Sequence, residues 1–450
     1  MMKPNHLALL LTILVCASPI GSLAQQATQD VPLLTLDDAV SIALSNNRVV
    51  KNSVLEAQKY DFQVSTMRSR RLPNFKFSVL GGELLQPFDF TFAKGTFGTY
   101  PGTGPIPSTD AKVHTPARMT AFLNGSIDQP LTQQYKIGLG IRATELGREI
   151  AKEDVRAERQ KIGVEVRSAY FELVATQSAV DAAREGVRTL EEAQRVTQRY
   201  IAEKAVLKGD ALEVDARLAK AQYELSVAEN GLATQHEHLN QLLARDLAIP
   251  FRVDSIPEED TTTLSLGEAR RQASENRPEI RQAHLREKQA DYDRRIAKAE
   301  YIPDFGIAVS YMGIQNVKVL PTNVAVAGFA MTWEPFDWGR RHNRVREKSN
   351  TLAQAHNGAQ ETESQIEVEV GLKYRKWKET ALLLKATRTG HEAAAEEFRV
   401  TSNKYQEQAA LVKDLLQAQA RSSETSFQYQ QALSSYWSSL ADLRRAMGEE

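Results

Sequence analysis

Two long stretches without proline, Leu131–Ile249 and Phe336–Glu450, constrain most strongly what this chain can fold into. All 16 prolines of the 450-residue sequence lie before or between them. Proline inside a helix costs about 3 kcal/mol, and both stretches are rich in residues that favour helices. A helix from near Thr132 to near Tyr200 would be roughly 100 Å long at the normal rise per residue. No single globular core needs such a helix, so the sequence predicts a coiled-coil rod or tube.

An apolar seven-residue repeat within Asp210–Ala244 supports the coiled coil. One series consists of Ala211, Leu218, Leu225, Leu232 and Leu239, and a second series, three residues later, consists of Val214, Ala221, Ala228, Gln235 and Leu242. This spacing is the a/d pattern of a coiled coil. The second series contains small side chains, so we expect helices that pack closely side by side.

The composition and the N-terminus narrow the class of protein. Charged residues make up 25% of the chain and the net charge is -1, so no basic surface for nucleic acid is expected. The apolar run Leu7–Val15 and the small-x-small site Ser22–Ala24 predict a secretory signal peptide over residues 1–24. Lipidation at Cys16, the only cysteine, is an alternative that Val15 disfavours, because lipoprotein signals carry Gly, Ala or Ser at that position. No later run of 18 apolar residues predicts a transmembrane helix.

The chain contains an internal duplication with an offset of 230 residues, from Thr35 to Ser265. Each of these residues begins a capping motif that predicts a short helix. A second predicted helix follows in each copy, Val49–Arg71 or Glu279–Tyr301, and ends at a Pro-Asn-Phe or Pro-Asp-Phe sequence. The match needs no gap over about forty residues, which indicates a repeated unit.

Alternating apolar and polar residues predict two β-strands in each copy. The first strands follow Pro73 and Pro303, and the second strands, near Met119–Asp128 and Val324–Trp333, end at a proline before the long helices. The loop Leu84–Pro116 between the first pair is long and rich in Gly, Pro and Thr. We expect it to lie outside the cell, with Phe88, Phe90 and Phe92 extending the hairpin.

Strands of about ten residues are long enough to cross a membrane when they are tilted, but four strands cannot close a barrel. Lipid tolerates no open sheet edge, so several copies of the chain are needed. The expected fold is mainly α with a membrane β-barrel. A helix–strand–strand–helix–helix unit is duplicated, and three copies form a twelve-stranded β-barrel continued by a long α-helical coiled-coil tunnel. The first repeat is expected over residues 25–249, a linker over 250–263 and the second repeat over 264–450.

The order of these features resembles the outer membrane efflux protein family, the TolC-like channels. The resemblance rests on Leu34–Ala39 with Asn46, on the two exits after the second helices, on Trp333–Arg340, and on the polar turns before Asp210 and Asp414. It implies a homotrimer in the outer membrane with a periplasmic helical domain. It also implies a passive exit duct of a tripartite efflux or type I secretion system, with a periplasmic adaptor and an inner-membrane pump as partners. Neither enzymatic activity nor a cofactor is implied.

The resemblance also indicates residues of the periplasmic aperture. Asp414 matches the first of two family aspartates at the start of the second return helix, and Gln417 stands at the place of the second. Tyr405 matches a family aromatic residue, and Asp210 matches the partner aspartate of the first repeat. Asp210 and Asp414 also have the pattern of capping boxes, each as the N-cap residue. Tyr405 is open to two interpretations, a gate residue or a packing residue.

The two tip turns are the expected docking sites for the adaptor, although the family's Val-Gly-Leu docking motif is missing from both. The docking candidates are the charged residues Glu203, Lys204, Lys208, Glu407 and Lys413. Trp333, Phe336 and Trp338 form either an aromatic belt at the membrane interface or an internal packing cluster.

Other functions have less support in the sequence. No catalytic triad spacing, phosphate-binding loop or cysteine cluster is present, and His236 and His238 are two apart on a helix and so do not face each other. An enzyme or a metal site is therefore not expected. The alternative to a channel is a periplasmic coiled-coil adaptor or structural protein without a membrane barrel.

Overall fold

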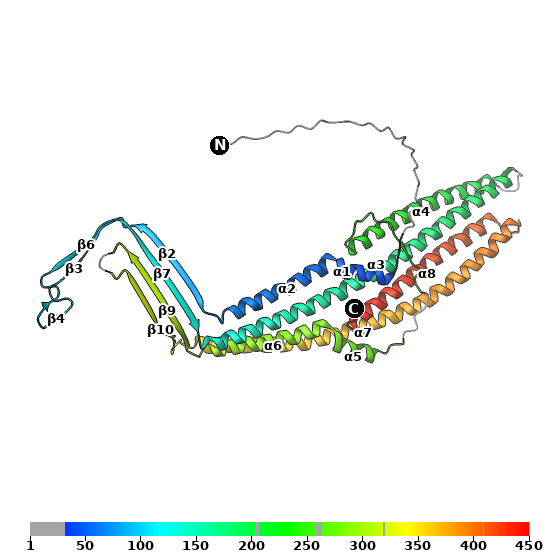
Figure 1. The fold of residues 1–450 in the computed structure, drawn as a ribbon. Helices are drawn as coiled ribbons and strands as arrows, with labels where there is room; N and C mark the ends of the chain where they lie inside the picture. The colour runs from blue at the N-terminus through cyan, green and yellow to red at the C-terminus, as the bar shows by residue number, and fades with distance from the viewer. Residues whose placement is uncertain (1–31, 203–206, 258–262, 318–319, 408, 450) are drawn as a thin grey trace, which may run out of the picture.

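The computed structural model describes residues 32–449 except 203–206, 258–262, 318–319 and 408, so the predicted signal peptide lies outside the described residues. The molecule is elongated, with a β-sheet at one end and the turns of two helical hairpins at the other (Figure 1). Among the described helices, none is both long and apolar enough to span a membrane.

The two halves of the chain contain the same series of elements. The first half consists of α1 (Leu36–Asn46), α2 (Arg48–Ser69), β2 (Asn74–Glu83), β7 (Met119–Pro130), α3 (Gln133–Ala202) and α4 (Lys208–Leu242). The second half consists of α5 (Leu266–Asn276), α6 (Pro278–Ala299), β9 (Asp304–Gln315), β10 (Asn323–Thr332), α7 (Arg340–Gln406) and α8 (Val412–Ala446). The predicted duplication is confirmed. The halves also meet at a short parallel pair, β1 (Leu33–Leu34) with β8 (Arg252–Val253).

Side-chain caps explain why α1 and α5 begin where they do. The Thr35 hydroxyl accepts a hydrogen bond from the Asp38 backbone N–H at 3.2 Å. The Ser265 hydroxyl accepts one from the Glu268 N–H at 3.1 Å. Each cap satisfies a backbone donor that has no partner within the helix. The predicted pair of equivalent caps is therefore present in the structure.

The sheet has the strand order β10-β9-β7-β2, and all its neighbouring strands are antiparallel. The central pair, β7 with β9, joins the two halves of the chain. β2 and β10 are the edge strands. The loop after β2 contains a second hairpin, β3 (Phe88–Phe92) with β6 (Ala111–Thr115), and a short pair, β4 (Thr99–Tyr100) with β5 (Gly104–Pro105). Figure 1 shows this excursion beyond the end of the sheet that is far from the helices.

The register gives the sheet two different faces, because side chains alternate along each strand. One face is apolar and carries Phe75, Phe77, Val79, Leu123, Ile127, Phe305, Ile307, Val309, Tyr311, Phe329 and Met331. The opposite face is polar in the half near the helices and carries Asn74, Lys76, Asn124, Ser126, Asp128, Asp304, Ser310 and Thr332. Farther from the helices this second face becomes apolar, with Leu80, Phe122 and Ile314. In the described part of the chain no helix covers either face (Figure 1).

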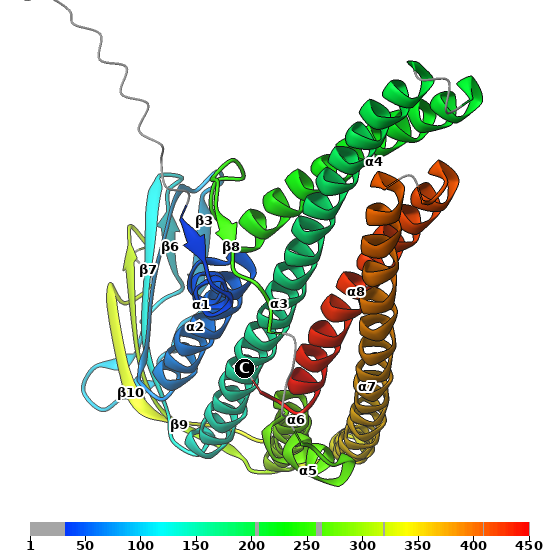
Figure 2. The ribbon, with the colours of Figure 1, turned by 90° about the vertical axis from the view of Figure 1, so that its right-hand side faces the viewer.

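The long helices pair as two hairpins, α3 with α4 and α7 with α8, which lie side by side (Figure 2). α8 also packs on α3, and α6 packs against both α3 and α7. Every member of the predicted heptad seam on α4 is at least partly buried. Three apolar clusters hold these helices together, one around α1 and α3, one around α5 and α7, and one near the hairpin turns.

Candidate functional site

The two return helices begin at the same end of the molecule, but not at the predicted residues (Figures 1 and 2). α4 begins at Lys208 and α8 at Val412, and their N-cap residues are Leu207 and Leu411. Asp210 and Asp414 therefore occupy the third helical position, and the prediction that they are N-caps is wrong. The leucine backbones already have the extended N-cap conformation, with ψ of 150° and 154°. A leucine side chain has no acceptor, so only the aspartate side of a capping box is formed.

Each aspartate reaches back to the turn from inside its helix. The Leu207 N–H donates to Asp210 Oδ2 at 3.3 Å, and the Leu411 N–H donates to Asp414 Oδ2 at 3.3 Å. A carboxylate in the first turn also interacts favourably with the helix dipole. Asp414 is exposed and Asp210 is partly exposed. The capping contact thus fixes where each carboxylate lies while leaving it accessible to ions.

Tyr405 lies between the two hairpins rather than at the surface. Its side chain is 4% exposed, and its hydroxyl is 3.1 Å from the hydroxyl of Thr197, which is 1% exposed. The ring packs edge-on against Tyr200, with 6.3 Å between ring centroids. Burial raises the pKa of the Tyr405 phenol, and Tyr200 and the Asp210 carboxylate raise it further. Tyr405 thereby links α7 of the second hairpin to α3 of the first.

An apolar cluster surrounds this link near the hairpin turns. Its buried members are Val187, Leu190, Ala193, Val214, Leu218, Leu415 and Leu416 together with Tyr405. They come from both hairpins, so the ends of the hairpins are held together by buried surface as well as by the hydrogen bond. Of the four aperture candidates, the structure brings Tyr405 and Asp210 near each other. Asp414 and Gln417 are exposed on α8.

The docking candidates Lys208, Glu407 and Lys413 are exposed at the two turns, whereas Glu203 and Lys204 lie outside the described residues. The two N-cap leucines, which were not among the predicted site residues, are strongly exposed, Leu207 at 76% and Leu411 at 69%. Each turn therefore presents one exposed leucine at an equivalent place. The signal was present in the sequence as Leu-x-x-Asp, which occurs at residues 207–210 and again at 411–414.

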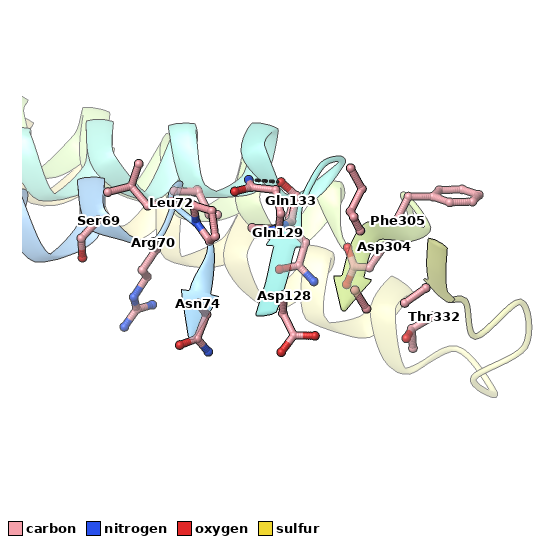
Figure 3. A pocket seen from close by; sticks show the side chains of 17 residues that line it. Ser69, Arg70, Leu72, Asn74, Asp128, Gln129, Gln133, Asp304, Phe305 and Thr332 are labelled. Carbon is pink, nitrogen blue, oxygen red and sulfur yellow. Dashed lines mark hydrogen bonds between the residues drawn. The ribbon is translucent and has the colours of Figure 1, made fainter. Parts of the chain in front are cut away.

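The junction of sheet and helices contains a cavity of about 840 Å³ on the polar side of the sheet (Figure 3). Figure 3 shows Arg70, Asn74 and Asp128 pointing to the same side, while Phe305 points away from them. Nearby, Lys136 pairs with Asp304 at 2.7 Å and so ties α3 to β9. The lining of the cavity contains polar side chains such as Asn74 and Asp128 and apolar side chains such as Leu72 and Ile137. Among the described residues no cluster of His, Cys, Asp or Glu suits a metal ion.

The aromatic residues at the same junction are exposed. Trp333, Phe336 and Trp338 have 55%, 71% and 90% of their surface accessible. Phe336 and Trp338 contact each other edge-on at 5.1 Å between centroids, but they do not enter an apolar core. Within one chain, therefore, internal packing does not account for these side chains.

Comparisons with known proteins agree with this geometry. The sequence profile described as outer membrane efflux protein matches residues 269–449. The fold is similar to the CmeC outer membrane channel of Campylobacter jejuni, with a TM-score of 0.73 and 18% identity over 92% of this chain and 85% of that one. The open-state MtrE outer membrane channel of Neisseria gonorrhoeae gives a TM-score of 0.71 and 18% identity, covering 92% of this chain and 89% of that one. The outer membrane protein VceC of Vibrio cholerae gives a TM-score of 0.71 and 15% identity, covering 92% of this chain and 96% of that one. A search of curated proteins finds no match.

The family match begins in α5 and continues through α8, so the similarity in sequence lies in the second half of the chain. The first half repeats the same elements, and the similarity in fold covers nearly the whole chain. The resemblance indicated by the sequence is therefore confirmed. By its sequence over residues 269–449, the chain is similar to the outer membrane efflux protein family.

Proposed function

We propose that three copies of this chain form the exit duct of a tripartite efflux or type I secretion system in the outer membrane. The observation that supports the proposal most strongly is that no helix covers the sheet and that its two faces differ. Its apolar face has no covering helix among the described residues, and its opposite face is polar near the helices. A sheet with lipid on one side and water on the other needs this arrangement. In a periplasmic adaptor without a membrane barrel, the eleven apolar side chains on this uncovered sheet face would be exposed to water.

The two edge strands require the copies to join. An edge strand presents unpaired N–H and C=O groups, and in lipid each unpaired group costs several kcal/mol. Pairing β2 of one copy with β10 of the next removes both edges. Three copies then give a closed twelve-stranded barrel, wide enough for an aqueous lumen, with the polar face turned inward.

The helices continue the lumen into the periplasm. Three copies supply six hairpins, whose seams are buried within each pair and whose charged faces meet water. The distance from the sheet to the hairpin turns is set mainly by α3, which at about 1.5 Å per residue extends roughly 100 Å. Such a tunnel carries solutes across the periplasm without binding them tightly.

The hairpin turns form the proposed aperture. The Tyr405–Thr197 contact and the surrounding apolar cluster hold the second hairpin against the first. Opening requires that the hairpins separate at this point. Asp414, exposed beside the turn, places one carboxylate per protomer there, and a narrow ring of carboxylates attracts cations.

The partners proposed are a periplasmic adaptor and an inner-membrane pump. The exposed Leu207 and Leu411, flanked by Lys208 and Lys413, offer an apolar contact with basic neighbours. A helical adaptor tip with a small apolar patch and acidic neighbours would complement them.

The test is to express the full-length chain, fractionate the cells and size the protein in detergent. The proposal expects an outer-membrane trimer that conducts ions in planar bilayers. A water-soluble monomer or dimer without conductance would instead support the adaptor alternative. Purified trimer that gives no conductance even after Tyr405→Phe would contradict the channel while leaving the membrane sheet intact.

A further inference from the structure

The start of α7 carries a basic segment that the equivalent helix of the first half lacks. Residues 340–348 contain four arginines and one lysine, Arg-Arg-His-Asn-Arg-Val-Arg-Glu-Lys. The equivalent start of α3, which also follows the second strand of its half, reads Gln-Gln-Tyr-Lys over 133–136 and has no arginine before Arg142. Since both helices begin in the same structural setting, the charge on α7 needs another explanation.

One of these arginines has a structural role. Arg341 is 7% exposed, and its Nε donates to Asp337 Oδ2 at 2.5 Å. The guanidinium also lies over the Tyr301 ring, 5.4 Å from its centroid, and donates to the Glu300 carbonyl at 3.3 Å. These contacts fasten the start of α7 to the end of α6. Arg341 is therefore not available to a ligand.

Three other cations lie together on one side of the helix. Arg340, Arg344 and Lys348, four residues apart, line a groove of about 660 Å³ together with Asn343 and Glu347. Their ion pairs are peripheral. Arg340 contacts the exposed Glu334, Arg344 contacts Glu300 at 3.2 Å, and Lys348 contacts Glu347 only at 3.9 Å. At least one side chain of each pair is more than half exposed. Ion pairs that are open to solvent contribute little to stability, so the cations can exchange these partners for a stronger anion.

The position of the groove indicates which anion it meets. Trp333 directly follows β10 and continues the alternation of Phe329 and Met331 on the apolar face. Trp338 precedes the N-cap residue of α7 and is two residues from Arg340. Exposed aromatic side chains mark the headgroup level of a membrane, and arginine and lysine beside them reach the lipid phosphates.

We propose that this groove binds the phosphate headgroup of an anionic phospholipid in the leaflet that faces the helices. The inference rests on the proposed function, because it needs the apolar face of the sheet to lie in lipid. Arg340 and Arg344 donate to the phosphate oxygens, Lys348 adds a third positive charge, and the acyl chains lie along Trp333 and the apolar face. Arginine suits phosphate because its planar donors contact two oxygens at once. A trimer has three such sites.

The experiment is native mass spectrometry of the full-length trimer in detergent, titrated with phosphatidylglycerol or with phosphatidylcholine as the zwitterionic probe. The variant is Arg340→Gln/Arg344→Gln/Lys348→Gln. The matched control is Lys376→Gln/Lys385→Gln/Arg399→Gln, which removes the same charge from the same helix far from the sheet. Each cation near a lipid phosphate strengthens binding by roughly fivefold. We therefore expect phosphatidylglycerol binding to weaken about a hundredfold in the first variant and to stay unchanged in the control.

The outcomes separate the two proposals. Equal binding of both lipids by the wild type, or equal loss in both triple variants, overturns the headgroup site while the trimer and its conductance remain. Full competition by millimolar inorganic phosphate shows a site for free anions and also overturns it. If the first variant fails to form trimers, the single substitution Arg344→Gln takes its place, with an expected weakening of about fivefold. A wild-type chain that forms no trimer refutes the proposed function itself.

Discussion

The contact between Tyr405 and Thr197 gives the sharpest test of how the hairpins are held together. Both hydroxyls are buried and lie 3.1 Å apart, on α7 and α3. Tyr405→Phe removes one hydroxyl with almost no change in shape and leaves the Thr197 hydroxyl buried without its partner. An orphaned buried hydroxyl costs about 1–3 kcal/mol. Since about 1.4 kcal/mol changes an equilibrium tenfold, each protomer should separate its hairpins roughly 5- to 140-fold more often.

The double variant Tyr405→Phe/Thr197→Val is the matched control. Replacing both partners by apolar groups of similar shape is close to neutral, so the double variant should behave more like the wild type than either single variant does. The assay is the open probability of single trimers in planar bilayers, with thermal unfolding measured in parallel. If Tyr405→Phe leaves the open probability unchanged, or if the two substitutions add, the hydrogen bond does not hold the hairpins together and Tyr405 is a packing residue.

Three further sets of substitutions test other parts of the molecule. Asp414→Asn should reduce the cation selectivity of the conductance, whereas Asp414→Glu should keep it. Both side chains can accept a hydrogen bond from the Leu411 N–H, but only glutamate retains the charge. Equal selectivity in both variants would leave Asp414 a capping residue. The hydrogen bond from Arg68 lowers the pKa of Glu145 below its ordinary value near 4.5, so its stabilisation of the α2–α3 contact is present above that pH and lost as the pH falls through the lowered pKa. Glu145→Gln should therefore flatten the thermal stability measured between about pH 3 and 6, and an unchanged profile would contradict this. Leu207→Ser/Leu411→Ser should weaken co-purification of the adaptor while changing the unfolding free energy by less than about 0.5 kcal/mol, because both side chains are exposed; normal co-purification would remove these leucines from the docking surface.

Local signals in the sequence were enough to predict most of the fold. Thr35 and Ser265 satisfy helix donors within three residues, so their capping role does not depend on the rest of the molecule. The absence of proline and the heptad spacing likewise act within single helices. The sheet followed from alternation along each strand, because the side-chain period of two fixes which residues share a face. These features need no knowledge of distant contacts.

The parts that were missed depend on contacts or on backbone geometry that the residue type does not determine. Aspartate is a favoured N-cap residue, so capping preference selected Asp210 and Asp414, while the backbone places leucine at both caps. Thr197 is 208 positions from Tyr405 in the sequence, and no local pattern links them. Gln417 and the charged docking residues need partner chains to be tested, so their roles remain proposals, as do the boundaries of the two repeats and the linker.

The pairing of β7 with β9 contains information about an interface that lies outside a single chain. In that pair, Ile127 is opposite Val309. Val79 is the counterpart of Val309 in the first half, 230 residues earlier. Met331 is the counterpart of Ile127, because each pairs with the phenylalanine that follows the exit proline of its half.

If the duplicated units follow one another around the barrel with approximate sixfold symmetry, the seam between copies repeats the seam within each copy. Met331 of one protomer then lies opposite Val79 of the next. The only cysteine of the chain is Cys16, in the predicted signal peptide. Val79→Cys/Met331→Cys should therefore link three chains into a covalent ring, whereas cysteines shifted by one residue in either strand should point to opposite sides and remain unlinked. On this proposal the duplication specifies the subunit interface twice, once as an intramolecular contact and once as the contact between molecules.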